Sequence, residues 1–186
     1  MPLYGAAAPF AIDGMQLTVG ESIMPRDVVT NGSVAIAGST VRFTYWRCSK
    51  SQTANSIRMI SGATAGAATS TVNRMAIYTI AANGDLTLGA STAHDANTFI
   101  AASTSYTRAL TTPQVLVRGT WYAHALLVVG AGTIPTIVGG SGAIGSSEGA
   151  IAPRIAGSVA GTALPASVLA ANVVASGVRL YAAILP

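Results

Sequence analysis

Few side chains in this chain are suited to acid–base, nucleophilic or metal chemistry. Its 186 residues include 2 His, 1 Cys and 6 carboxylates. The carboxylates are scattered between the N-terminal region and predicted loops, without the close pair that glycosidases use: Asp13, Glu21, Asp27, Asp85, Asp95 and Glu148. This set predicts a protein that is not an enzyme and that needs no cofactor or dedicated metal. A carbonyl-rich ion site between copies stays open.

Two glycine-rich stretches match functional signatures by spacing. Residues 140–145 match the dinucleotide-binding pattern, but Gly149 and Pro153 interrupt the helix that must follow, and no acid lies about 20 residues further on. Residues 145–149 match the nucleophile elbow around Ser147, but neither a further acid nor a His follows. Both stretches are therefore predicted to be loops without catalytic function.

The remaining reactive residues favour structural roles. His94 and Asp95 are adjacent, so in a strand they would point to opposite faces, and a turn-capping role is expected. His124 lies in an apolar run far from His94 in sequence, and Cys48, in an aromatic run, is expected to be a buried thiol. Most aromatic residues fall in predicted strands, where core or interface packing outweighs a sugar-binding platform: Tyr45, Trp46, Tyr78, Trp121, Tyr122 and Tyr181.

The composition is unusually poor in charge. Only 9% of residues are charged and 51% are apolar, against about 25% charged in typical soluble proteins. The net charge of +4 comes from scattered arginines and one lysine, with no basic run that would predict nucleic-acid binding. So few charges predict a module that buries surface against neighbours, and hence an oligomer.

Residues 1–32 differ from the rest, because Pro and Gly interrupt them at short intervals and no helical or strand period appears. We interpret them as an extended arm for docking or assembly; the alternative is that the arm folds back as edge strands of its own domain. Its start lacks the basic region of a signal peptide, and the longest apolar stretch, 123–140, is broken by Gly and Pro, so no membrane span is predicted. The expected contact residues are Leu3, Tyr4, Phe10, Ile12, Met15 and Ile23.

Residues 33–186 are predicted to form a second unit, an antiparallel β-sandwich of the jelly-roll kind. Short strands are expected at 41–48, 57–60, 72–80, 86–88, 98–102, 106–110, 115–117, 121–129, 133–138, 154–159 and 178–185. Asn83-Gly84 predicts a two-residue hairpin turn. Residues 163–175 contain Pro165 and several valines, so they are predicted to be a loop with at most one helical turn.

Several short stretches of this second unit resemble the β-sandwich domain of virion proteins of tailed bacteriophages, especially minor tail and fibre proteins of phages that infect actinobacteria. The resemblance covers roughly residues 33–186 and implies a non-enzymatic, commonly oligomeric protein displayed on the particle. The stretches are Arg74-Met75-Ala76-Ile77-Tyr78, Asn83-Gly84-Asp85-Leu86-Thr87-Leu88, Tyr106-Thr107-Arg108-Ala109-Leu110, Arg118-Gly119-Thr120-Trp121-Tyr122-Ala123 and Ile134-Pro135-Thr136.

The sequence analysis therefore leads to an expected virion structural protein of the minor tail or fibre type. A homotrimer is expected, attached through its arm to other tail or capsid proteins. A short arm followed by one sandwich also suits a capsid decoration protein. A receptor-binding or carbohydrate-binding module that recognises a host cell-surface glycan is the alternative from a different class.

Overall fold

The structure is a computed structural model that describes residues 21–22, 32–67, 70–141 and 156–186. These residues form short and long strands with one 3-10 turn, and no α-helix lies among them. The elements are β1 (Glu21–Ser22), β2 (Ser33–Ala35), β3 (Thr40–Arg47), β4 (Gln52–Ile60), β5 (Ser70–Ile80), β6 (Leu86–Ser91), β7 (Ser105–Leu116), β8 (Trp121–Gly130), β9 (Thr136–Ser141), β10 (Ala156–Ala160), β11 (Ser167–Val168), the 3-10 turn η4 (Ala170–Asn172), β12 (Val174–Ala175), β13 (Val178–Leu180) and β14 (Ala183–Leu185).

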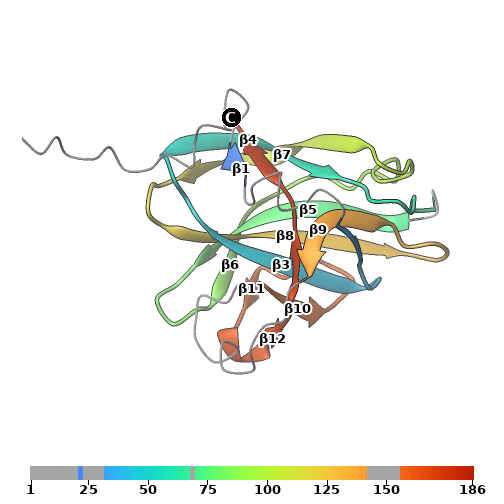
Figure 1. The fold of residues 1–186 in the computed structure, drawn as a ribbon. Helices are drawn as coiled ribbons and strands as arrows, with labels where there is room; N and C mark the ends of the chain where they lie inside the picture. The colour runs from blue at the N-terminus through green and yellow to red at the C-terminus, as the bar shows by residue number, and fades with distance from the viewer. Residues whose placement is uncertain (1–20, 23–31, 68–69, 142–155) are drawn as a thin grey trace, which may run out of the picture.

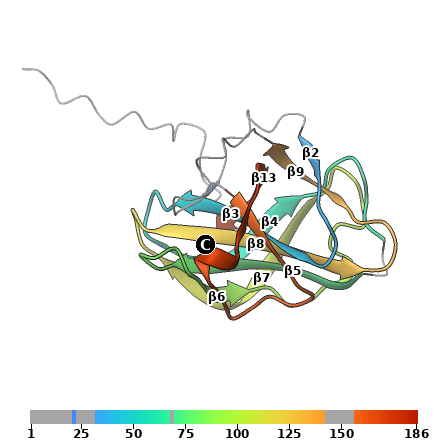
Figure 2. The ribbon, with the colours of Figure 1, turned by 90° about the horizontal axis from the view of Figure 1, so that it is seen from below.

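The strands form three antiparallel sheets. A seven-stranded sheet has the order β11-β6-β5-β8-β3-β10-β12, a four-stranded sheet the order β1-β14-β4-β7, and a three-stranded sheet the order β13-β9-β2. The larger two sheets lie in separate layers, and the seven-stranded sheet curls toward β11 and β12 (Figure 1 and Figure 2). The prediction of an all-β antiparallel sandwich is confirmed. No helix in the described residues is long and apolar enough to cross a bilayer.

The main core fills the space between the sheets. The four-stranded sheet contributes Ile57, Met59 and Ile184, and the facing side of the seven-stranded sheet contributes Met75 and Leu126, among others. All five side chains are almost completely buried. Alternating apolar residues on facing strands thus supply the hydrophobic stabilisation of the sandwich, at about 25 cal/mol per Å² of apolar surface removed from water.

A second core lies on the opposite face of the seven-stranded sheet. There Phe43 and Tyr78 pack edge to face at 5.3 Å between ring centroids. Residues 161–175, called the covering segment below, close this face with Val168 and Val173, and the Tyr78 hydroxyl donates to the carbonyl of Pro165 (2.9 Å). Burial raises the pKa of Tyr78 above its usual value, so the hydroxyl keeps its proton as a donor.

Strand β8 is buried on both faces because it runs between the two cores. Its burial pattern is continuous from Tyr122 to Val128, and the odd and even side chains belong to different cores. This explains why the sequence from 122 to 128 lacks the alternation of polar and apolar residues that a half-exposed strand shows. The predicted strand at 121–129 is confirmed at this place.

The predicted hairpin between β5 and β6 is present, but its turn differs in type. The Ala81 carbonyl accepts from the Gly84 N–H (2.9 Å), and the Ala81 N–H donates to the Asp85 carbonyl (2.9 Å). Of Asn83 and Gly84, only Gly84 has a positive φ, at 87°. This is a three-residue loop ending in a left-handed glycine, which fits the strand twist as a two-residue turn would.

Other strand predictions need correction. Residues 98–102 are not a strand but a turn, in which Phe99 has φ 70° and is fully buried. The strands predicted at 106–110 and 115–117 are one strand, β7, whose register with β4 shifts between Ala54 and Ser56. The strand predicted at 178–185 is two strands, β13 and β14, in different sheets. The single helical turn allowed within 163–175 is η4.

Part of the predicted arm belongs to the sandwich. Glu21 and Ser22 pair with Ile184 and Ala183, so β1 is an edge strand of the four-stranded sheet. The six expected contact residues of the arm lie outside the described residues: Leu3, Tyr4, Phe10, Ile12, Met15 and Ile23.

Candidate functional site

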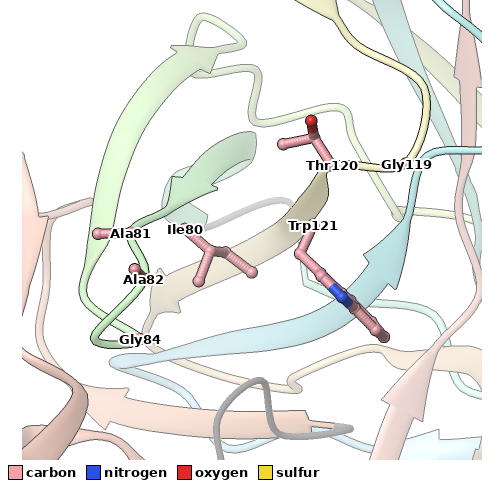
Figure 3. Close-up of a pocket in the computed structure, with 7 residues that line it drawn as sticks. All are labelled: Ile80, Ala81, Ala82, Gly84, Gly119, Thr120 and Trp121. Carbon is pink, nitrogen blue, oxygen red and sulfur yellow. The ribbon is translucent and has the colours of Figure 1, made fainter.

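A pocket opens at one end of the sandwich, between the hairpin that follows β5 and the turn that precedes β8. Its volume is about 260 Å³. Figure 3 shows Ile80, Ala81 and Ala82 on one side and Trp121 facing them from the start of β8. The rest of the lining is Gly84, Gly119 and Thr120. Apart from the indole N–H and the Thr120 hydroxyl, the lining side chains are apolar or absent, while polar atoms make up a substantial part of the lining surface.

Trp121 is the exposed aromatic side chain among the described residues. It is 39% exposed, whereas every other aromatic residue that the structure describes is buried. It stands on the same face as the second core, directly opposite Arg47 in the register of β3 and β8. Directly opposed side chains in an antiparallel pair are close neighbours, so the indole and the guanidinium share the rim of the pocket.

Hydrogen bonds hold this rim in place. The Gly119 N–H donates to the Cys48 carbonyl (2.8 Å), and the Cys48 N–H donates to the Thr120 carbonyl (2.9 Å). The Nε of Arg47 donates to the Gly119 carbonyl (2.9 Å). Gly119 has φ +83°, a conformation that glycine adopts without strain. The turn before β8 and the end of β3 therefore form one rigid unit.

The electrostatic character of this end is basic. Arg47, Lys50 and Arg118 are all exposed and lie on the two connections that meet there. The carboxylate of Asp85, which directly follows the pocket residue Gly84, is bonded to the Ala170 N–H (2.7 Å) and to the Asn83 side-chain amide (2.8 Å). Among the described residues, Arg108 is the one cation that forms an ion pair with a carboxylate.

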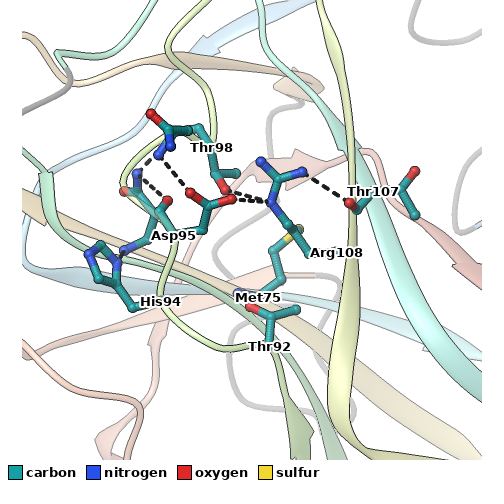
Figure 4. Close-up of polar contacts among 9 residues, drawn as sticks. Met75, Thr92, His94, Asp95, Thr98, Thr107 and Arg108 are labelled. Atoms are coloured by element: carbon teal, nitrogen blue, oxygen red, sulfur yellow. Dashed lines mark hydrogen bonds and ion pairs between the residues drawn. The ribbon is translucent and has the colours of Figure 1, made fainter.

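The predicted pair His94 and Asp95 belongs to a separate polar network beside β7 (Figure 4). Nδ1 of His94 accepts from the Asn73 N–H (2.9 Å), while Asp95 pairs with Arg108 (2.8 Å between Oδ2 and Nε). Asp95 Oδ1 also accepts from the Asn97 N–H (2.8 Å). Asp95 caps the turn as predicted, whereas His94 bonds the backbone of β5, and the two side chains have different partners.

Arg108 connects this turn to the edge of the sandwich. Its Nε also donates to the Thr98 hydroxyl (3.0 Å), and its guanidinium carbon lies 5.5 Å from the centroid of the Tyr106 ring. Phe99 packs against Tyr106 at 5.2 Å between centroids. Every polar group of Asp95 and Arg108 named here bonds within this loop and its neighbouring strand, so these bonds hold the loop in place.

The other histidine and the cysteine are buried. His124 is 0% exposed in the main core, and burial lowers its pKa to about 3. Cys48 is buried as expected, and its Sγ lies 2.9 Å from the Lys50 carbonyl, to which it donates. Residues 142–149, which carry Ser147 and most of the two glycine-rich motifs, lie outside the described residues. In the described part of the chain, no three His, Cys, Asp or Glu side chains gather closely enough to bind a metal ion.

Sequence reasoning placed Trp121 in a packed strand and did not connect it with Arg47. The signal that was missed is the position of Trp121 within its strand. Trp121 is the first residue of β8 and directly follows the turn at Gly119 and Thr120. A residue at the end of a strand meets solvent even when the middle of that strand is buried on both faces. Comparison of the chain with models of protein families and with curated proteins finds no match.

Proposed function

We propose that the protein is a structural component of a bacteriophage virion, of the minor tail or fibre type, that assembles with further copies of itself. Its expected form is a homotrimer that attaches to neighbouring virion proteins through its N-terminal residues. A capsid decoration protein is the variant of this proposal in which the same module sits on the head. Both forms require a rigid module with a surface for other copies.

The observation that carries the proposal is a stretch of chain without charged residues that includes the covering segment and exposes two large apolar side chains. From Ala156 to Val178 the described chain has no charged residue, and it includes Leu169, 59% exposed, and Val174, 67% exposed. Large apolar side chains exposed without flanking charges are typical of surfaces that become buried in assemblies. This stretch lies at the opposite end of the molecule from the four-stranded sheet (Figure 1).

The edge of the seven-stranded sheet at this stretch offers a way to add a second copy. Strand β12 is the last strand of the sheet and pairs with β10 through only two residues, Val174 and Ala175. A strand edge without a neighbour attracts another strand unless charges or proline protect it. Val174 and Ala175 are neither charged nor proline, and among the described strands only β10 pairs with them, which favours self-association over a free monomer.

Two rigid cores support a mechanical role for the module. The polar network around Asp95 and Arg108 fixes the long connection before β7, and the hydroxyl of Tyr78 fixes the covering segment. His94, Asp95 and Asp85 form hydrogen bonds within the fold, and His124 is completely buried. This use of the reactive groups agrees with a protein whose function is to hold its shape.

The proposal is tested by the position of the protein on a particle and by its mass in solution. Gold-labelled antibody against the full chain, viewed by electron microscopy, is expected to mark the tail; label over the head would instead identify a decoration protein. Light scattering at micromolar concentration is expected to give a multiple of 18.6 kDa. Particles without label would contradict the virion role, and a mass of 18.6 kDa at all concentrations would contradict self-assembly.

A further inference from the structure

We propose that the pocket at Trp121 binds a saccharide that carries an anionic group. One face of the sugar ring would stack on the indole of Trp121, and the carboxylate or phosphate of the sugar would pair with the guanidinium of Arg47. This inference goes beyond the structural role proposed above and does not depend on it, because the pocket belongs to the isolated module.

The first step of the argument is the exposure of Trp121. The fold buries all other described aromatic residues, and Trp46, on the same pair of strands, is 5% exposed. Leaving a large aromatic side chain in water forgoes the hydrophobic stabilisation that burial provides. The backbone of Trp121 belongs to β8, which is paired on both sides, so only the two side-chain torsions of the indole have to be ordered when a flat ligand binds.

The second step is the size and lining of the pocket. A volume of about 260 Å³ lies just below the range of about 300–1,000 Å³ that is typical of sites for drug-sized ligands and cofactors. A single sugar ring matches this space. The wall opposite the indole is made of Ile80, Ala81 and Ala82. Such walls suit the C–H face of a sugar, whose hydroxyl groups can point out of the half-open mouth.

The third step is charge. The guanidinium of Arg47 is anchored by its bond to the Gly119 carbonyl, and Gly119 itself lines the pocket. Lys50 and Arg118 add positive charge at the same end, and no carboxylate lines the pocket. An anchored arginine binds carboxylates and phosphates through charge-assisted hydrogen bonds. The site therefore favours an acidic sugar over a neutral one.

A nucleic-acid strand fits these observations less well. Single-stranded nucleic acids bind along a track of several aromatic residues and cations, which stack successive bases and neutralise successive phosphates. In the described chain the pocket offers one exposed aromatic side chain and one anchored arginine at its rim. The site has the dimensions of a single ring, so an oligonucleotide serves as a competitor in the test.

The experiment uses the two tryptophans of the full chain. Trp121 and Trp46 give separate indole N–H signals in a ¹⁵N NMR spectrum, which the variant Trp121→Phe assigns, and the buried Trp46 acts as an internal reference. The ligands are sodium glucuronate, glucose 6-phosphate, glucose and a short oligothymidylate. Both acidic sugars are expected to shift the Trp121 signal in a saturable way without moving that of Trp46, and to bind about tenfold more tightly than glucose.

Three variants separate the roles of the side chains. Trp121→Ala is expected to abolish binding of all sugars as measured by calorimetry, and Arg47→Gln to remove the about tenfold preference for acidic sugars while leaving glucose unchanged. Arg118→Gln is the matched control, because it removes the same charge from the same end of the molecule but not the guanidinium that stands opposite Trp121 and bonds the Gly119 carbonyl. It should change affinity less than about twofold. Circular dichroism checks the fold of each.

Specific results would overturn the proposal. A Trp121 signal that does not move with either acidic sugar at millimolar concentration excludes a saccharide site. Equal affinity for glucose and glucuronate excludes the role of Arg47 in selecting an anion. Tighter binding of the oligothymidylate than of both acidic sugars assigns the pocket to nucleic acid. None of these results bears on the labelling and light-scattering tests of the virion role.

Discussion

His124 shows how one polar residue can be buried at a cost to stability. It stands in the middle of β8, opposite Thr44 and Ile77, and neither ring nitrogen has a hydrogen-bond partner among the described residues. The hydroxyl of Thr44, which pairs with His124 from β3, accepts from the Leu180 N–H (3.0 Å). A neutral imidazole has one N–H donor and one nitrogen acceptor, so His124 places two polar groups without hydrogen bonds in the core. A hydrocarbon side chain would place none there.

We therefore expect His124→Leu to stabilise the fold. Leucine has a similar volume and removes two buried groups without partners, so the free energy of unfolding at pH 7 should rise by about 1–3 kcal/mol. Urea denaturation of both proteins measures the difference, and near-ultraviolet circular dichroism shows whether the core packing is kept. A variant less stable than the original chain would show that the imidazole has a favourable contact that the described residues do not provide.

The same residue predicts a pH dependence. The pKa of His124 is about 3 in the folded state and 6.5 as the unperturbed value, so between these pH values the unfolded chain binds a proton that the folded chain does not. Protonation of His124 in the unfolded chain therefore has little effect above pH 6.5, but it lowers the free energy of unfolding as the pH falls toward 3, by about 1.4 kcal/mol per pH unit. His124→Leu should remove about 2 kcal/mol of the stability change between pH 7 and pH 5. If the free energy of unfolding of the variant falls with pH as steeply as that of the original chain, His124 is not the source of this pH dependence.

At the scale of elements, the sequence was informative where one local signal decides the outcome. Gly84 of the Asn83-Gly84 pair readily adopts the positive φ that a tight turn of the chain needs. The hairpin was therefore predictable, although its turn type was not. Residues 98–102 misled because their composition suits a strand. There two side chains from earlier in the sequence bond the backbone of the turn. Asn73 Nδ2 donates to the Thr98 carbonyl (3.0 Å), and the Asp95 carboxylate accepts from the Asn97 N–H. Such tertiary bonds override local propensity and leave no periodic pattern.

The candidate pocket was less predictable than the strands for a related reason. It is formed by two connections, the hairpin after β5 and the turn before β8, which are far apart in sequence. Their approach depends on the register between β5 and β8, which pairs Thr79 with Tyr122, and the register between β3 and β8 places Arg47 opposite Trp121. The residue types were visible in the sequence, but the register that joins them is a property of the whole sheet.

The contact between β9 and β13 provides a test of sheet packing with a matched control. A Cβ atom at Gly139 would lie 2.3 Å from the Arg179 carbonyl oxygen and 2.7 Å from the side chain of Val34, whereas one at Gly140 would meet nothing within 4 Å. Gly139→Ala is therefore expected to lower the free energy of unfolding by about 1–3 kcal/mol, because backbone must move. Gly140→Ala should be neutral or slightly stabilising. Equal effects of the two changes in urea denaturation would contradict the close approach of these strands.

At the scale of the whole molecule, the two proposed contact surfaces lie on the same side of the seven-stranded sheet. Trp121 stands beside Arg47 on the face of the second core, and the covering segment closes that face with Leu169 and Val174 exposed. Asp85 connects the two surfaces, because it follows the pocket residue Gly84 and its carboxylate accepts from the Ala170 N–H. Assembly through the covering segment is therefore expected to change ligand binding at the pocket.

The last prediction concerns the N-terminal residues, which we expect to attach the module to a larger particle. The described residues of the two main cores extend from Val34 to Ile184, and β1 begins at Glu21. Deleting residues 1–20 should therefore leave a folded protein of unchanged cooperativity in urea denaturation and of unchanged oligomeric state in light scattering. The deleted segment contains five of the six expected contact residues: Leu3, Tyr4, Phe10, Ile12 and Met15.

Energetics explain why this deletion should abolish incorporation into particles. Each contact side chain contributes about 1.5–3 kcal/mol when buried, while ordering an extended chain costs about 1–2 kcal/mol per residue, so a single arm binds weakly. Several arms on one oligomer act together through their effective concentration. Replacing the five side chains by Ser in the full-length chain should have the same effect as the deletion, which separates lost contacts from lost length. A truncated protein that is unfolded or insoluble would show that these residues complete the sandwich itself, and a truncated protein that still enters particles would place the attachment elsewhere.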